Sequence, residues 1–391
     1  TPKTLYEGVF KLEPGHYLEV DLQNNSLLKS KYWNLEVKEH STTVKKASKT
    51  IRKLIEISVQ DQLISEVPVG VFLSGGIDSS IVVAESSKAV EGISTYSIGF
   101  ESEKFDETKY AKKVSQTFVT NYRELTMYEA CTNDLYKNIA VWYDEPFSDT
   151  SAFSTYLVSK FAKEEVTVVL TGDGGDEIFG GYSWYSAFKR LRPFHLRLPK
   201  RIKKYFLNRS IKNKKSLFGR VLNRFRYLLL NDFELHTTLM SGLLKEQKVK
   251  YAKKFNICDD YDDYWYFRKY YRKELKLLTR LQYLDFHTYL PDDILTKVDR
   301  VSMAVSLEAR VPLLSTELVE YMFSIPEKVR YSNGELKGLI KSAYKGILPK
   351  EIIARGKKGF DIPIDSWNSL FDNSYDSTQE KILNDLFSDR F

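Results

Sequence analysis

Two spacings of apolar residues alternate along the first half of the chain. Short apolar runs typical of buried strands occur at residues 67–73, 93–100 and 166–170. Other segments, such as residues 41–66, repeat apolar residues every three or four positions, which is the spacing of one helix face. Strands that alternate with helices predict an α/β fold in which a parallel sheet carries helices on both faces.

The two ends of the chain follow other patterns. Residues 15–22 and 27–35 are two β-type segments on either side of the polar turn at residues 23–26, which predicts a hairpin. Beyond residue 188 the strand signal fades and helical spacing dominates. We therefore expect a β-rich segment over residues 1–40, an α/β core over residues 41–188 and a mainly helical part over residues 189–391.

Composition places the 391-residue chain among globular proteins, with 42% hydrophobic and 28% charged residues. No apolar run approaches the ~20 residues needed to span a bilayer, so we expect no membrane partner. Cys131 and Cys258 are isolated in the sequence. Isolated cysteines fit a reducing cytoplasm and offer neither a disulfide framework nor a zinc site.

The formal net charge of +7 comes largely from one segment. Residues 189–231 contain no acidic residue, and such a basic run could bind RNA or polyphosphate. Its interspersed leucines and aromatic residues favour a solvated helical surface whose apolar side faces inward. We therefore do not expect a nucleic-acid partner.

The first candidate site is the sequence SGGIDSS at residues 74–80, which directly follows an apolar run. Two glycines allow the backbone to approach a ligand closely, and hydroxyl and N–H groups at the start of a helix bind anions. Asp78 would repel a phosphate unless a divalent cation lay between them, so the pattern predicts a multiply charged phosphate and Mg²⁺. An ordinary strand-to-helix turn capped by Asp78 is the alternative. The candidate binding residues of this segment are Ser74, Gly75, Gly76, Asp78, Ser79 and Ser80.

The second candidate site is the sequence TGDGGDEIFGGY at residues 171–182, which also follows an apolar run. Asp173, Asp176 and Glu177 place carboxylates where a metal ion would bridge to a phosphate. The alternative is an acidic surface turn. Because ligands of parallel sheets lie beyond the carboxyl ends of the strands, we expect both segments to open onto one crevice.

Together the two motifs resemble a known family. SGGIDSS resembles the pyrophosphate-binding loop of the ATP pyrophosphatase group, whose fold is described as adenine nucleotide alpha-hydrolase-like. TGDGGDEIFGGY is similar to a loop in the synthetase domain of glutamine-hydrolysing asparagine synthetases. The helix expected to carry SLEARVPLL, the RGKKGF segment and the loop at residues 144–159 extend the resemblance over residues 5–367.

The resemblance implies roles for individual residues. Asp78 and Asp176 match ligands of Mg²⁺–pyrophosphate. Lys357 matches a lysine that neutralises charge on the α-phosphate and the departing pyrophosphate, although Lys358 could also serve. The positions that match the lining of the adenosine site are Leu73, Ile98, Thr171 and Gly172.

An acidic pair is also implied. Glu308 and Asp173 match residues near the acyl-adenylate of the family. Glu308 could instead form a helix salt bridge with Arg310 or Arg300. Relatives carry glutamate at this position, or tyrosine in a related ring-forming synthetase, and Asp173 is shorter than glutamate.

The activity implied by the resemblance is ATP-dependent amide synthesis. Aspartate would attack the α-phosphorus of Mg·ATP, giving β-aspartyl-AMP and pyrophosphate, and ammonia would then release asparagine and AMP. GDGGDE in place of the GEGSDE of housekeeping enzymes keeps open another acceptor carboxylate, such as a sugar uronate or a peptide. A tRNA-modifying adenylating enzyme is a weaker alternative.

The intact family enzyme begins with a glutaminase domain that supplies ammonia from glutamine. The opening sequence KTLYEGVFKLEPGHYLEVDL resembles the segment that follows this domain. We therefore expect the glutaminase to have been cut away or to lie on another polypeptide. A homodimer is a possible assembly of this chain. We expect a cytoplasmic location.

Overall fold

The structure is a computed structural model that describes residues 1–102, 105–127, 138, 141–145, 147, 149–197, 199, 229–241, 261, 262 and 264–356. The chain divides into two compact units. The first comprises Thr1–Phe179 and Leu290–Phe391, and the second comprises Gly180–Tyr289. The domain boundaries expected after residues 40 and 188 stay a prediction.

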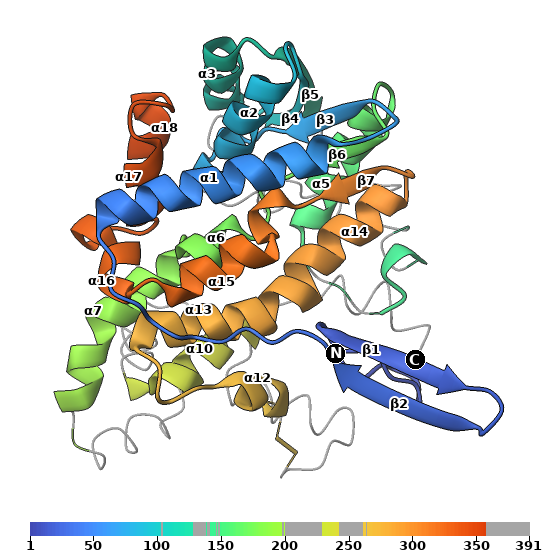
Figure 1. The fold of residues 1–391 in the computed structure, drawn as a ribbon, viewed down its shortest axis with the longest axis vertical. Coiled ribbons are helices and arrows are strands. Elements are labelled where there is room, and N and C mark those ends of the chain that lie inside the picture. Colours follow the sequence, from blue (N-terminus) through green and yellow to red (C-terminus); the bar gives the residue numbers. More distant parts are fainter. Residues whose placement is uncertain are drawn as a thin grey trace. The chain divides into compact units, whose positions relative to one another are not determined.

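The first unit is built on a five-stranded parallel sheet with the strand order β5-β4-β3-β6-β7 (Figure 1). After β3 the chain adds β4 and β5 on one side, and then adds β6 and β7 on the other side. The order therefore reverses between β3 and β6, which is where open α/β sheets bind ligands. The strands are β3 (Val69–Phe72), β4 (Ser94–Phe100), β5 (Asn121–Met127), β6 (Val168–Leu170) and β7 (Glu308–Arg310).

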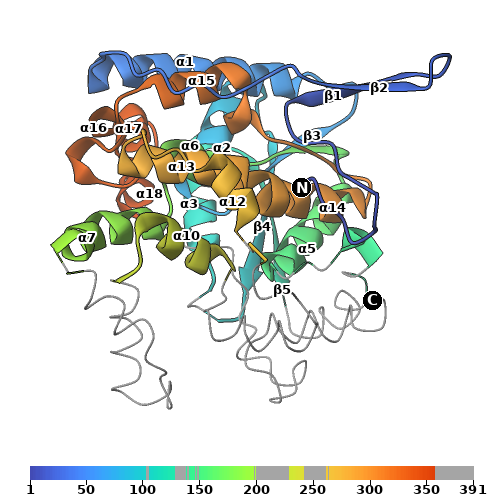
Figure 2. The same ribbon diagram turned by 90° about the horizontal axis from the view of Figure 1, so that it is seen from below.

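Helices cover both faces of this sheet, as the turned view shows (Figure 2). On one face lie α2 (Ile77–Ala89) and α3 (Thr108–Phe118), and on the other lie α5 (Ser151–Lys163) and α14 (Thr296–Met303). Gly99 of β4 faces α3, because a Cβ atom on it would lie 2.8 Å from Thr108 Cγ2. The predicted parallel sheet with helices on both faces is confirmed.

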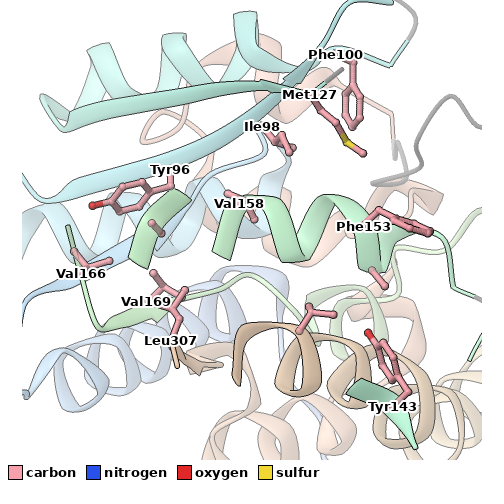
Figure 3. Close-up of a cluster of buried hydrophobic side chains, with 13 residues drawn as sticks. Tyr96, Ile98, Phe100, Met127, Tyr143, Phe153, Val158, Val166, Val169 and Leu307 are labelled. Atoms are coloured by element: carbon pink, nitrogen blue, oxygen red, sulfur yellow. The ribbon is translucent and has the colours of Figure 1, made fainter. Parts of the chain in front are cut away.

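An apolar cluster joins α5 to the sheet (Figure 3). Tyr96, Ile98 and Phe100 share one face of β4, since alternate strand residues point the same way. Phe153 and Val158 of α5 pack against them. Burying each such side chain contributes about 1.5–3 kcal/mol, so the cluster fixes α5 and the residues at its first turn.

The remaining elements of the first unit include the predicted hairpin. Strands β1 (His16–Asp21) and β2 (Ser26–Lys31) pair antiparallel, with Tyr17 opposite Ser30, and this prediction is confirmed. In the part of the chain that the structure describes, no helix is long and apolar enough to cross a bilayer. The further helices are α1 (Val44–Leu63), α6 (Gly175–Phe179), α15 (Thr316–Ser324), α16 (Glu327–Arg330), α17 (Gly338–Tyr344) and α18 (Lys350–Ala354).

The SLEARVPLL segment does not lie on an α-helix, contrary to the expectation: it forms a short strand followed by the 3-10 turn Pro312–Leu314. A π-helical turn, Leu290–Leu295, leads into α14, which ends at Met303. Ser306 then adopts a left-handed conformation with φ 57°, and the chain continues as β7. Backbone pairing with β6 explains the difference, because Thr171 N donates to Arg310 O at 2.8 Å.

The described part of the second unit is helical. Its helices are α7 (Ser183–Arg197), α10 (Asp232–Ser241), α12 (Trp265–Tyr270) and α13 (Leu277–His287). The fully buried carboxylate of Asp285 joins three of its side chains. His236 Nε2 lies 2.5 Å from Asp285 Oδ1, and Oδ2 accepts from the Tyr185 hydroxyl at 2.5 Å and Trp184 Nε1 at 3.2 Å.

We expect Asp285→Ala to lower the free energy of unfolding by about 3–5 kcal/mol, because it leaves buried polar partners without their acceptor. Urea unfolding of the whole chain, followed by tryptophan fluorescence, would measure the loss. Asp262→Ala is the control, since Asp262 pairs with Arg268 at an exposed site and should cost less than about 1 kcal/mol. Equal losses in the two variants would contradict the role given to Asp285.

Candidate active site

The first glycine-rich loop joins β3 to the start of α2. Gly75 has φ +73°, and a Cβ atom on it would lie 2.7 Å from Tyr110 Cβ, so glycine is required on both counts. Ser80 Oγ donates to Gly76 O at 2.6 Å, and the hydroxyl oxygens of Ser74 and Ser79 are 3.1 Å apart. The loop thus gathers hydroxyl groups at the N-terminus of a 13-residue helix. Binding of a phosphate there stays a prediction.

The second glycine-rich loop follows the neighbouring strand β6 and packs directly on the first. A Cβ atom on Gly172 would lie 2.7 Å from Ser79 N, and one on Gly175 would lie 2.5 Å from the carboxyl carbon of Asp78. Only glycine allows this approach. The two segments therefore lie side by side at the carboxyl ends of β3 and β6, as predicted.

Lys337, which the sequence analysis did not single out, joins the two aspartates. Its Nζ lies 2.5 Å from Asp176 Oδ1 and also forms an ion pair with Asp78 Oδ2. Burial disfavours the ammonium, but the carboxylates of Asp176 and Asp78 outweigh it, so the pKa of Lys337 lies above its ordinary value. The structure thus brings Asp78 and Asp176 to one buried cation.

The backbone of Lys337 is held in an uncommon conformation. It has φ 56° and immediately precedes α17. The next residue, Gly338, packs so tightly that a Cβ atom on it would lie 2.2 Å from Ser332 O. A left-handed non-glycine residue costs about 1–3 kcal/mol, and such outliers cluster at functional sites. A sequence signal that could have pointed to Lys337 is its position at a helix N-terminus, where the helix dipole disfavours a cation.

The residues present fit a magnesium ion held with a pyrophosphate. Mg²⁺ is commonly bound by one or two protein carboxylates together with phosphate oxygens. Asp78 and Asp176 supply two carboxylates that lie close together, since both pair with the same Lys337 Nζ. Among the described residues, no group of three or more His, Cys, Asp and Glu could hold a metal ion by itself. The other ligands would therefore come from the substrate and water.

A second buried lysine lies beside the first turn of α5. Lys297 Nζ is 3.0 Å from Asp149 Oδ2 and 2.8 Å from Ser151 Oγ. Burial disfavours its ammonium, but Asp149, Asp173 and Asp293 outweigh this and raise its pKa above the ordinary value. Asp173 therefore belongs to an acidic cluster around Lys297.

The positions predicted to line the adenosine lie on strands of the sheet or just beyond their ends. Leu73 is buried, and its N–H donates to Tyr96 O at 2.8 Å. Ile98 belongs to the apolar cluster under α5, and Thr171 is buried at the end of β6. Contact of these residues with an adenosine stays a prediction.

Glu308 does not lie with Asp173. It is level with Val168, the first residue of β6, whereas Asp173 lies three residues beyond Leu170, the last residue of that strand. Arg310 Nε donates to Glu308 Oε1 at 2.6 Å, so the structure shows the alternative ion pair, although on a strand rather than a helix. Lys357 and Lys358 lie outside the described residues.

Comparisons with known proteins identify the family of the chain. The family model of asparagine synthase matches residues 50–390. A glutamine-hydrolysing asparagine synthetase 1 of Bacillus subtilis is 34% identical over 371 residues, covering 94% of this chain and 57% of the relative. A putative glutamine-hydrolysing asparagine synthetase 2 of Methanocaldococcus jannaschii is 36% identical over 317 residues, covering 78% of this chain and 58% of the relative.

A more distant relative carries a different name. The amidase chyE of Penicillium rubens is 25% identical over 407 residues, covering 93% of this chain and 60% of the relative. The chain thus spans less than two thirds of the length of each relative described. The match of the family model over most of the sequence establishes that the chain belongs to the asparagine synthase family.

Proposed function

We propose that this chain is the synthetase part of an asparagine synthetase and forms an amide from aspartate, ATP and ammonia. The β-carboxylate attacks the α-phosphorus, the bond to pyrophosphate breaks, and ammonia then displaces AMP from β-aspartyl-AMP. The observation that carries the proposal is the convergence of Asp78 and Asp176 on Lys337, where two glycine-rich loops follow neighbouring parallel strands.

The two loops are proposed to bind the pyrophosphate part of ATP. The N-terminus of α2 and the hydroxyl groups around it attract the phosphates, and Asp78 and Asp176 are the proposed Mg²⁺ ligands. When bound, Mg²⁺ neutralises charge on the phosphates and makes pyrophosphate a better leaving group. Lys337 keeps a buried positive charge where negative charge builds on the departing group. Lys357 stays a second proposed cation.

The cluster around Lys297 favours an amino acid as the acceptor. Its carboxylates suit a substrate ammonium, and the Lys297 ammonium suits a substrate carboxylate. Aspartate carries both groups, whereas a sugar uronate has no cation to offer. We therefore retain Asp173 as a proposed acid of this site and assign Glu308 only to its pair with Arg310.

Ammonia is proposed to come from glutamine through a glutaminase encoded outside these 391 residues. The relatives from Bacillus subtilis and Methanocaldococcus jannaschii are named glutamine-hydrolysing, and this chain covers 57% and 58% of their lengths. We also propose a cytoplasmic location, in keeping with two isolated cysteines.

A second candidate keeps the chemistry and changes the acceptor. The relative chyE of Penicillium rubens is named an amidase and matches this chain at 25% identity. This name favours a carboxylate other than free aspartate as the alternative, for example one on a larger molecule.

Pyrophosphate release tests both candidates. The chain would be supplied with Mg·ATP, ammonium and one of several acids: aspartate, glutamate, glucuronate or an aspartyl peptide. We expect release that depends on aspartate and yields equal amounts of AMP and asparagine, with Asp78→Asn as the background control. Release with glucuronate or the peptide but without aspartate would establish the second candidate, and no release with any acid would overturn both.

A further inference from the structure

Arg355 contacts the first glycine-rich loop from the side of α3. Its Nη1 donates to Gly75 O at 3.1 Å, and its Nη2 pairs with Glu107. The guanidinium lies 4.2 Å from the centre of the Tyr110 ring. Because the side chain is only 12% exposed and held by three partners, Arg355 has one well-defined position.

The carbonyl that Arg355 holds belongs to the same peptide group as the N–H of Gly76. In a trans peptide the C=O and N–H bonds point in opposite directions, so fixing one fixes the other. Gly75 and Gly76 are also the residues whose backbone rotates most freely, and a peptide between two glycines has little steric resistance to turning over. The hydrogen bond from Arg355 restrains this peptide at its carbonyl end.

The N–H of Gly76 is well placed to receive an anion. Gly76 is the residue that precedes the first turn of α2, where the positive end of the helix dipole lies. In the structure this N–H donates to Ser74 Oγ at 3.3 Å, which is long for a hydrogen bond. A phosphate oxygen is a stronger acceptor than a hydroxyl and would replace Ser74 Oγ as the partner of this N–H.

We propose that Arg355 is a positioning residue that aligns the Gly75–Gly76 peptide so that its N–H faces the pyrophosphate. This inference rests on the proposed function of the loop. Arg355 acts through the backbone and does not itself bind the anion, because its guanidinium already serves Glu107, Gly75 O and the Tyr110 ring. Glu107 also neutralises its charge.

Binding measurements without turnover test the proposal. Calorimetry on the whole chain would give the dissociation constants of magnesium pyrophosphate and of AMP. In Arg355→Gln we expect pyrophosphate to bind about tenfold or more weakly, the usual worth of a charge-assisted hydrogen bond, and AMP to bind within about twofold of wild type. Arg355→Lys should recover part of the loss, since lysine can still donate to Gly75 O.

Glu351→Gln is the matched control, because Glu351 on α18 forms an exposed ion pair with Lys113 and does not contact the loop. It should leave both constants unchanged. Equal weakening of pyrophosphate and AMP in Arg355→Gln, or no weakening of either, would overturn the inference. Failure of the wild-type chain to bind pyrophosphate would instead overturn the proposed function of the loop.

Discussion

Lys337→Met is expected to slow pyrophosphate release, with aspartate and ammonia present, by about a hundred- to a thousandfold. Lys337 forms ion pairs with both Asp78 and Asp176 and is almost completely buried. Methionine keeps the length of the side chain but removes the charge that would stabilise the departing pyrophosphate. Pre-steady-state measurement of pyrophosphate release would report this step directly.

The same variant has a second expected property. Without the ammonium, the carboxylates of Asp78 and Asp176 repel each other in a buried place, so the melting temperature should fall. Added Mg²⁺ should raise the melting temperature of Lys337→Met more than that of the wild type, because the ion replaces the missing charge. Thermal unfolding with and without Mg²⁺ would measure the difference.

Lys341→Met is the matched control for both measurements. Lys341 lies on the same helix, α17, and pairs with Glu335 at 3.6 Å near the surface. Its rate should stay within about twofold of wild type, and Mg²⁺ should have no added effect on its stability. Similar behaviour of the two variants would remove Lys337 from the proposed site.

The central part of the fold could be predicted because its strands are buried on both sides. Strands β3, β4 and β6 are nearly continuous apolar or small residues, and the segments between them carry helical spacing. This pattern specifies a parallel sheet. It also predicts that loops after neighbouring strands meet, which is how Asp78 and Asp176 could be placed together before the structure was known.

The two edge strands could not be predicted in the same way. β5 has the sequence NYRELTM and is partly exposed, and β7 contains only Glu308, Ala309 and Arg310. Charged and polar side chains are usual on edge strands, where they discourage pairing with other chains, but they hide the apolar pattern. β7 is defined by its backbone pairing with β6, which no local signal reveals.

Lys337 was missed for a related reason. It lies 161 residues after Asp176, and only the three-dimensional fold brings it to the two loops. Its left-handed backbone is followed by the tight contact of Gly338 with Ser332, and local sequence specifies neither feature. By contrast, RGKKGF drew attention to Lys357 through its resemblance to a family motif. The same rate measurement on variants of Lys357 and of Lys337 would separate the contributions of the two lysines.

Asp78→Asn and Asp176→Asn are each expected to reduce pyrophosphate release by at least about a hundredfold at limiting Mg²⁺. Asparagine has the shape of aspartate but lacks the charge that a hard cation requires. Each variant leaves one carboxylate to pair with Lys337, so the fold should be kept. A titration of Mg²⁺ at saturating ATP would show the rate recovering in part at high concentrations of the ion.

Asp61→Asn is the control, because Asp61 is an exposed residue of α1, outside the two loops. It should change neither the rate nor its dependence on Mg²⁺. The two site variants should differ from each other in one respect. Gly175 of α6 packs against the carboxyl group of Asp78, so the change at residue 78 disturbs α6 as well as the metal ligand. The rate of Asp78→Asn should therefore recover less at high Mg²⁺ than the rate of Asp176→Asn. Near wild-type turnover of a variant at limiting Mg²⁺ would show that its aspartate is not a ligand.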